Sequence, residues 1–364
     1  MRRKFSIKKI TFLLFLVSFV SVAQHSDSTT VENQPKEEKN LKASIKEYIN
    51  HHLLDSYDFG LFSYTDDNKE VHHIGAPLPI ILWDNGLKVF LSSKFHHGET
   101  VAEVGGNYYK VYHNKIYKTD AEGTITYDAE KHPTHAKPLD YSITKNVVFI
   151  FLVGLLMFFV FTRMAKNYQK NALPKGVGRL LEPIILYIRD DIAIPNIGEK
   201  HYRKYMSYLL TVFFFVWIIN LLGLTPLGVN VTNNIAVTLV LALITFILTN
   251  VTANKNYWGH IFWMPGVPKL MRIVLAPIEL LGLVIKPFSL MIRLYANITA
   301  GHIVLMSIIG LMFIFKSWIG SPLSFGLAFA LSLLELLVAA LQAYIFTMLS
   351  ALYFGSAVEE HDDH

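Results

Sequence analysis

Residues 287–297 read PFSLMIRLYAN and place Arg293 in the middle of a long apolar stretch. About twenty mostly apolar residues flank Arg293 on each side, and this is the length of a membrane-spanning helix. A guanidinium group stays protonated in proteins, so its charge at membrane depth costs at least about 2.5–3.5 kcal/mol. An arginine near a helix end can extend its charge to the membrane surface, but Arg293 is too far from either end. We therefore interpret Arg293 as a functional residue.

The composition indicates a membrane protein with a polar N-terminal region. Of the 364 residues, 52% are hydrophobic and 17% are charged, and the mean hydropathy is +0.36. Residues 24–140 are polar and mixed, whereas residues 141–356 carry nearly all the long apolar runs. The net charge of +5 comes from basic residues beside those runs, which indicates membrane topology and not binding to nucleic acid. The absence of cysteine excludes disulfides and thiolate metal sites.

Residues 1–23 have the pattern of a signal peptide. A basic start precedes the apolar run 10–20, and Ser21-Val22-Ala23 is a small-residue cleavage pattern. The apolar run is short for a membrane span, which favours cleavage after Ala23 over an uncleaved anchor helix. With either alternative, residues 24–140 are expected to form an exported, periplasmic N-terminal module.

The exported module has β character. Short runs of β-branched and aromatic residues are bounded by turn residues, and the last two runs flank a turn at His113-Asn114. We therefore predict a small module that contains these strands. The runs are residues 80–83, 88–91, 108–112 and 115–119.

Five apolar segments predict an all-α membrane domain over residues 141–356, with about five membrane passes. The fourth and fifth segments are longer than the roughly twenty residues that cross a bilayer. They predict two long C-terminal helices that are tilted or kinked, and Pro277 and Pro287 offer places to bend. The segments are residues 147–161, 206–224, 235–251, 273–315 and 323–354.

The charges of the loops predict the topology. The segment 163–204 holds nine Lys and Arg residues and is expected to be cytoplasmic, whereas the loop 225–234 holds none and is expected to be external. This orientation places the tail 357–364 in the cytoplasm and agrees with an exported N-terminal module. The sequence therefore predicts a multi-pass protein of the cell inner membrane.

Residues 177–193 of the basic segment have the spacing of an amphipathic helix. A helix along the cytoplasmic membrane surface and a helix that binds a soluble partner both predict this pattern.

Polar residues recur at helical spacing around Arg293. Glu279, Lys286 and Arg293 are each seven residues apart, so on a helix they form one slowly drifting stripe. Ser289 and Asn297 stand four residues on either side of Arg293 and lie within about 40° of that stripe. The predicted helix is thus mostly apolar but has one polar face.

A second polar face is predicted on the same helix. His302 follows Arg293 by nine residues and points about 180° away from it, and Glu335 and Gln342 share a face of the last span. Asn297 or Gln342 alone is explained by hydrogen bonding between helices. Arg293, His302 and Glu335 together indicate a path for protons or cations, because such a path needs titratable groups inside the membrane.

These residues resemble a known family. Residues 286–301 (KPFSLMIRLYANITAG), Glu335 with residues 341–346 (LQAYIF), and residues 220–226 (NLLGLTP) are similar to subunit a of the F-type ATP synthase. The resemblance covers about residues 141–356 and leaves the exported module outside.

The resemblance implies a proton-translocating subunit that provides two half-channels and couples ion flow to rotation and ATP synthesis. Arg293 matches the family's essential arginine, which faces the ring of c subunits and their ion-carrying carboxylates. The implied partners are the c-ring, the stator subunit b, other subunits of the F-type ATP synthase and membrane lipid. The residues implied around the external half-channel are Asn297, His302, Glu335 and Gln342, and those near the cytoplasmic exit are Glu279 and Ser289.

Some bacterial members of the resembled family hold Glu at the position of His302 and His at that of Glu335. This exchange implies that the two side chains face one another. A fixed charge at Arg293 would favour the ionised form of a ring carboxylate, and it would also block a direct leak between the half-channels.

A secondary ion transporter with a buried Arg/Glu/His relay is the alternative, but it should show internal repeats, and the sequence has no such period. The sequence shows no phosphate-binding loop, nucleophile elbow or metal motif. Its adjacent histidines, at 51/52, 72/73 and 96/97, share no face of a strand or helix. We therefore expect no cofactor, no metal and no catalytic residue, and assign any ATP chemistry to partner subunits.

Overall fold

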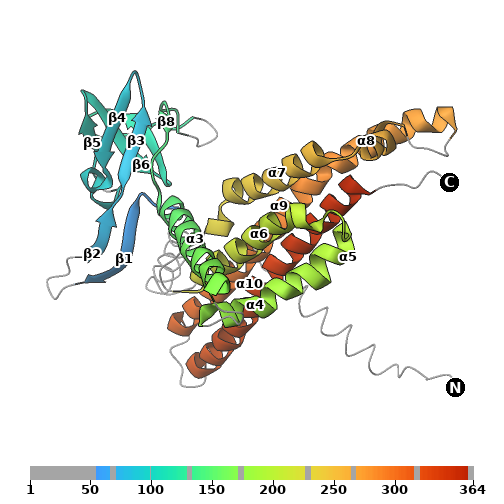
Figure 1. Cartoon of the computed structure of the whole chain (residues 1–364). Helices are drawn as coiled ribbons and strands as arrows, with labels where there is room; N and C mark the ends of the chain where they lie inside the picture. The colour runs from blue at the N-terminus through green and yellow to red at the C-terminus, as the bar shows by residue number, and fades with distance from the viewer. Residues whose placement is uncertain are drawn as a thin grey trace, which may run out of the picture. The chain divides into compact units, whose positions relative to one another are not determined.

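The computed structural model of the chain has strands between Asp58 and Asp140 and long helices from Lys145 onward (Figure 1). The signal peptide predicted at residues 1–23 and the tail beyond Glu359 lie outside the described residues. The structure describes residues 55–65, 71–98, 100–128, 133–170, 176–225, 231–263, 268–314 and 320–359.

The strands form three small antiparallel sheets, in the orders β1-β2, β4-β3-β8 and β5-β6-β7. The four predicted strands are confirmed as β3, β4, β6 and β7. Four further strands were missed. Both β1 and β2 contain glycine, β2 also contains adjacent histidines, and β5 and β8 are very short. The strands are β1 (Asp58–Thr65), β2 (Val71–Pro77), β3 (Pro79–Trp83), β4 (Leu87–Leu91), β5 (Ala102–Val104), β6 (Asn107–Tyr112), β7 (Lys115–Thr119) and β8 (Leu139–Asp140).

The hairpin between β6 and β7 turns at the predicted position. His113 and Asn114 have φ angles of 46° and 54°, and Tyr112 pairs with Lys115 across them. Positive φ at both central residues is the geometry that matches the twist of a two-residue hairpin. The β-rich region has its own small core, in which Ile80, Leu82, Phe95 and Tyr109 are almost completely buried.

Asp55 caps the first long helix, α3 (Lys145–Lys170), from outside that helix. The Asp55 carboxylate accepts a hydrogen bond from the backbone N–H of Asn146 at 3.2 Å, and the carbonyl oxygen of Ser56 accepts one from the N–H of Lys145 at 3.0 Å. These acceptors satisfy N–H groups that the first turn of a helix leaves unpaired. Burial raises the pKa of Asp55 despite these hydrogen bonds.

Five of the described helices, α3, α6, α7, α9 and α10, are long and apolar enough to cross a membrane. This finding confirms the predicted fold class of an all-α membrane protein with an added β-containing N-terminal region. The remaining helical elements are short. After α3 the chain forms α4 (Val177–Tyr187), the π-helix η2 (Ile188–Ala193), α5 (Ile194–Ile197), α6 (Tyr202–Gly223), η3 (Val231–Asn233), α7 (Ile235–Thr252), α8 (Lys255–Phe262), α9 (Lys269–Ile314) and α10 (Gly320–Val358).

The last two helices are long, as predicted, and they pack against each other. Helix α9 has 46 residues and α10 has 39, so at a rise of 1.5 Å per residue they extend for roughly 69 and 58 Å. Both lengths exceed the hydrocarbon thickness of about 30 Å, so neither helix fits an upright orientation within it. Pro277 and Pro287 lie inside α9 and each removes a backbone donor. Helix α10 continues to Val358, so the predicted tail 357–364 begins within the helix.

The amphipathic segment 177–193 packs partly against its own chain. Its second half contributes Ile188 and Ile192, which are completely buried in the core of the helical region. In its first half, Leu180 is 72% exposed. Because η2 contacts α6 and α10, packing within the chain explains the apolar residues of the second half. A membrane surface or a soluble partner is needed to explain only the apolar residues of the first half.

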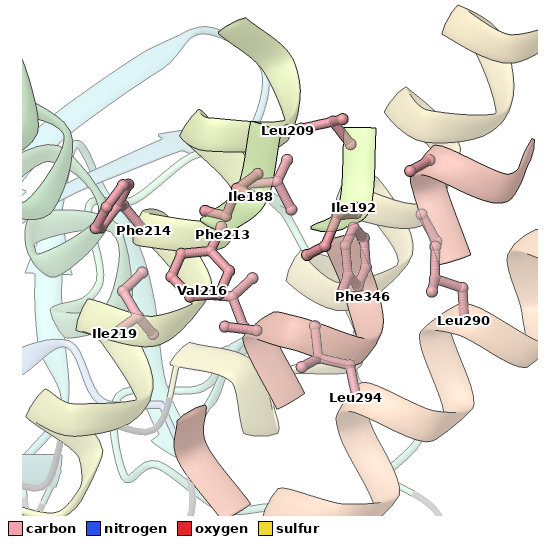
Figure 2. Close-up of a cluster of buried hydrophobic side chains, with 14 of the residues drawn as sticks. Ile188, Ile192, Leu209, Phe213, Phe214, Val216, Ile219, Leu290, Leu294 and Phe346 are labelled. Atoms are coloured by element: carbon pink, nitrogen blue, oxygen red, sulfur yellow. The ribbon is translucent and has the colours of Figure 1, made fainter. Parts of the chain in front are cut away.

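The helical core joins η2, α6, α9 and α10 (Figure 2). Tyr205 of α6 stacks on Phe354 of α10, with ring centroids 4.4 Å apart, and its hydroxyl donates to Thr252 of α7 at 2.6 Å. These contacts hold α6 against α10 and α7. The labelled residues in Figure 2 are Ile188, Ile192, Leu209, Phe213, Phe214, Val216, Ile219, Leu290, Leu294 and Phe346.

Gly355 is the point at which α10 approaches α5 most closely, because a Cβ atom at Gly355 would overlap the carbonyl oxygen of Asn196. We predict that Gly355→Ala lowers the free energy of unfolding by about 1–3 kcal/mol, the usual cost of overpacking against backbone. Thermal unfolding of the purified protein in detergent would measure the change. Gly326→Ala is the matched control on α10, because a Cβ at Gly326 meets no atom within 4 Å. Equal melting temperatures for the two variants would contradict the prediction.

Candidate functional site

A cavity of about 330 Å³ lies among α6, η3, α9 and α10. Helices α9 and α10 supply most of the lining, and the short η3 segment contributes Thr232. The polar residues that line it are Asn220, Thr232, Asn297, His302, Glu335 and Gln342.

The structure brings together four residues predicted from the sequence, namely Asn297, His302, Glu335 and Gln342. Asn297 and His302 come from α9, and Glu335 and Gln342 come from α10. The spacing of seven residues places Glu335 and Gln342 on one face of α10, and the contact between α9 and α10 turns that face toward His302.

His302 and Glu335 lie next to each other in the lining of the cavity. Their Nδ1 and Oε1 atoms are 3.5 Å apart, which is an ion-pair distance and is too long for a well-formed hydrogen bond. Both side chains are largely buried. Neither carboxylate oxygen of Glu335 has a hydrogen-bond partner among the residues that the structure describes.

A buried carboxylate without hydrogen bonds is costly, so Glu335 requires a polar partner. The cavity volume exceeds the space that one water molecule needs, and the lining provides several donors and acceptors. Water entering this cavity would hydrogen-bond to Glu335. The site can therefore exchange protons between its titratable pair and water.

Gly301 lets Glu335 approach α9. A Cβ atom at Gly301 would lie 2.9 Å from Oε1 of Glu335, closer than side chains normally come. A glycine at this position of α9 therefore leaves space for the carboxylate beside His302. The sequence showed Gly301 as part of a family resemblance and as a possible bend, but it gave no sign of this contact, which depends on how α9 packs on α10.

Two buried polar residues of the cavity were not predicted as site residues. Thr232 donates a hydrogen bond to Oδ1 of Asn220 at 2.9 Å. The Nδ2 group of Asn220 is buried without a partner in the described part of the chain. Asn220 was visible in the sequence as a lone amide in an apolar span, whereas Thr232 lies in a predicted external loop and carried no signal.

Arg293 lies outside the cavity lining and is half-buried. Its neighbours on α9, Leu290 and Leu294, are buried in the core. Tyr353 of α10 is close enough to Arg293 for an electrostatic interaction, and the ammonium group of Lys286 lies 5.6 Å from the centre of the Tyr353 ring. Arg293 and Lys286 thus share an aromatic neighbour on α10, away from the His302–Glu335 pair.

Glu279 and Ser289 also lie outside the cavity lining. Ser289 is exposed, and Glu279 is half-buried near α8. Burial raises the pKa of Tyr257 of α8, and the negative charge of Glu279 contributes less to the same shift. Tyr257 and Lys286 line a second, much smaller cavity of about 10 Å³, at the lower limit for one water molecule.

The described residues include no group of three or more His, Cys, Asp or Glu residues that could hold a metal ion. A titratable pair lines the cavity, and the permanently charged Arg293 lies on another part of α9. Neither feature is needed by a helix that only anchors a protein in lipid.

Comparison with known proteins agrees with this geometry. A family model described as the ATP synthase A chain matches residues 147–355. A second model, described only as a domain of unknown function, matches residues 48–141.

Three relatives are similar over about the same length of chain. The chain is 42% identical over 233 residues to "ATP synthase subunit a" of Chloroherpeton thalassium, an alignment that covers 62% of this chain and 69% of the relative. It is 47% identical over 236 residues to that of Chlorobium phaeobacteroides strain DSM 266, covering 62% and 68%. It is 41% identical over 235 residues to that of Myxococcus xanthus, covering 62% and 77%.

The matched region contains all five long helices except their outermost residues, and it includes the whole cavity lining. By this match and by its helical fold, the chain belongs to the family of subunit a of the F-type ATP synthase.

Proposed function

We propose that the chain conducts protons through two half-channels in the membrane sector of an ATP synthase and thereby couples their flow to rotation. The observation that carries this proposal is the His302–Glu335 pair in the wall of a cavity of about 330 Å³, whose mostly apolar lining includes six polar residues. A purely structural pair would be expected to satisfy its buried hydrogen-bonding groups. Neither carboxylate oxygen of Glu335 has a hydrogen-bond partner among the described residues. Both oxygens are therefore available for hydrogen bonds to water, as proton exchange requires.

The cavity is proposed as the half-channel from the external side. The η3 segment in its wall belongs to the loop 225–234, which has no Lys or Arg. Under the positive-inside rule such a loop is external, and the basic segment 163–204 is cytoplasmic. In this orientation the N-terminal module 24–140 is periplasmic after removal of residues 1–23, and the C-terminal tail 357–364 is cytoplasmic in the cell inner membrane.

Arg293 is proposed to separate the two half-channels and to face the c-ring. Family membership implies ring subunits as partners, together with subunit b. A ring carboxylate must be neutral when it faces lipid, because a bare charge in hydrocarbon is costly. The guanidinium of Arg293 favours the ionised carboxylate by proximity, so a proton is released there. Its fixed charge also repels cations that would leak directly between the paths.

The region of Lys286, Tyr353 and Glu279 is proposed as the beginning of the cytoplasmic exit, with exposed Ser289 beside it. Support comes from the small cavity at Lys286 and from the electrostatic proximity of Tyr353 to Arg293. This cavity is far smaller than the external one. The exit therefore requires surfaces supplied by the c-ring.

The energy for ATP synthesis comes from the ions and not from chemistry in this chain. One charge that crosses about 100 mV releases roughly 2.3 kcal/mol, so several translocation steps are needed for each ATP. The chain is proposed as a non-catalytic, translocating subunit, and ATP formation is assigned to partner subunits.

We predict that Arg293→Ala abolishes both ATP synthesis and ATP-driven proton pumping in vesicles that contain the reconstituted complex. The ring carboxylate would lose the cation that favours its ionised form. ATP formation after an imposed proton gradient and quenching of a pH-sensitive dye would measure the two directions.

The matched control for Arg293→Ala is Arg203→Ala, which removes an exposed arginine at the start of α6. This control should retain both activities. Coupled ATP synthesis by an intact complex with Arg293→Ala would contradict the role proposed for Arg293.

We predict that exchanging the two titratable residues preserves proton flux better than either single change. His302→Glu places two carboxylates beside each other, and Glu335→His places two imidazoles there, so each should slow flux on the order of 100-fold. The double variant His302→Glu/Glu335→His restores an acid beside an imidazole and should recover most of the flux.

Passive proton flux through the membrane sector in vesicles would test this exchange. Ser332→Ala is the control, because Ser332 is exposed on α10 and its hydroxyl donates to the backbone of Ala328. Two slow single variants with an equally slow double variant would show that the pair does not act as a unit. Unchanged flux in both single variants would remove these residues from the path.

We predict that Gly301→Ala slows proton flux by moving the carboxylate of Glu335 away from His302. The new methyl group would lie 2.9 Å from Oε1, and the flexible side chain would yield before the backbone does. Gly282→Ala is the control on the same helix, because a Cβ there meets no atom within 4 Å. Equal flux through the two variants would show that the close approach at Gly301 has no role in conduction.

A further inference from the structure

One face of the β4-β3-β8 sheet is apolar and exposed. Val89 in the middle of β4 is 59% exposed, and Trp83 at the end of β3 is 54% exposed. Half-buried Ile81 lies opposite Val89 in the register. The large exposed apolar side chains of this face are Trp83, Leu87, Val89, Leu91, Leu139 and Tyr141.

The strand register makes these side chains neighbours. Trp83 pairs with Leu87 on one side and with Leu139 on the other, and residues directly opposite each other point to the same face. The other face of the sheet is already buried, since Ile80 and Leu82 lie in the core. A sheet with one buried face normally presents polar residues on the other, so a continuous exposed apolar face indicates a binding surface.

Only a very short segment of chain connects this sheet to α3. The backbone N–H of Tyr141 donates to Ile81 at 2.9 Å, and that of Ile143 donates to Pro79 at 3.1 Å. The pairing with β3 therefore continues to within two residues of Lys145, where α3 begins. The four residue-to-residue steps from Tyr141 to Lys145 span at most about 14 Å. The edge of the sheet is thus held close to the first turn of α3, which is long and apolar enough to cross a membrane.

We propose that this apolar face binds the surface of the lipid bilayer that α3 crosses. Trp83 and Tyr141 are the residue types that prefer the boundary between lipid headgroups and acyl chains, and leucine and valine fill the area between them. None of the six exposed residues of this face is charged. The N-terminal module then attaches to the membrane surface beside α3. This role is separate from proton conduction.

The absence of cysteine from the chain permits a direct test. Val89→Cys, made in the full chain and modified with a nitroxide spin label, would be reconstituted in vesicles of phosphatidylethanolamine and phosphatidylglycerol. Electron paramagnetic resonance then compares relaxation of the label by oxygen, which concentrates in lipid, with relaxation by a water-soluble nickel complex. Glu103→Cys on exposed β5 is the matched control.

We expect the label at Val89 to be relaxed several-fold more by oxygen than by nickel, and the label at Glu103 to show the reverse. Leu91→Cys provides a second position on the same face and should behave like Val89. Nickel access at both face positions equal to that at Glu103 would show that the face contacts water and would overturn the proposal. Protection from both reagents would show that protein covers the face, and would overturn it as well.

Discussion

The cost of placing charge in hydrocarbon is the constraint on which the rest of this structure depends. Arg293 and Glu335 are both in helices long and apolar enough to cross a membrane, where an unpaired charge costs several kcal/mol. The surroundings of these two charged side chains differ. Glu335 lies beside His302 in the wall of a cavity, whereas Arg293 is half-buried near the aromatic ring of Tyr353. In the proposed mechanism, a carboxylate of the c-ring provides the missing counter-charge at Arg293.

The two polar regions are kept apart by one rigid helix. Arg293 and His302 are nine residues apart on α9, so their side chains point in nearly opposite directions around its axis. Leu290, Leu294 and Ile298 fill the core between these faces with buried apolar side chains. Asn297 lies one helical turn from Arg293 and lines the cavity, whereas this apolar packing lies between Arg293 and the His302–Glu335 pair. This separation is what two half-channels require.

Residue type and helical period were sufficient to predict much of the fold and part of the site. The apolar runs predicted all five long helices, and the spacing around Arg293 predicted the two polar faces of α9. Contacts between distant segments were not predictable in this way. The Thr232–Asn220 hydrogen bond, the close approach of Glu335 to Gly301 and the burial of η2 all depend on tertiary packing. The exposed face of the β4-β3-β8 sheet likewise required the register of β8, which is too short to recognise from sequence.

The position of Arg293 in the assembled membrane sector tests the central claim most directly. A cryo-electron microscopy structure of the complex in lipid would measure the distance from the Arg293 guanidinium to the nearest ring carboxylate. The account predicts a separation within about 6 Å for one ring subunit, the range in which an opposite charge stabilises the ionised form. It also predicts that the cavity at His302 and Glu335 opens to the external side. An Arg293 side chain directed away from the ring, with no carboxylate in that range, would contradict the account.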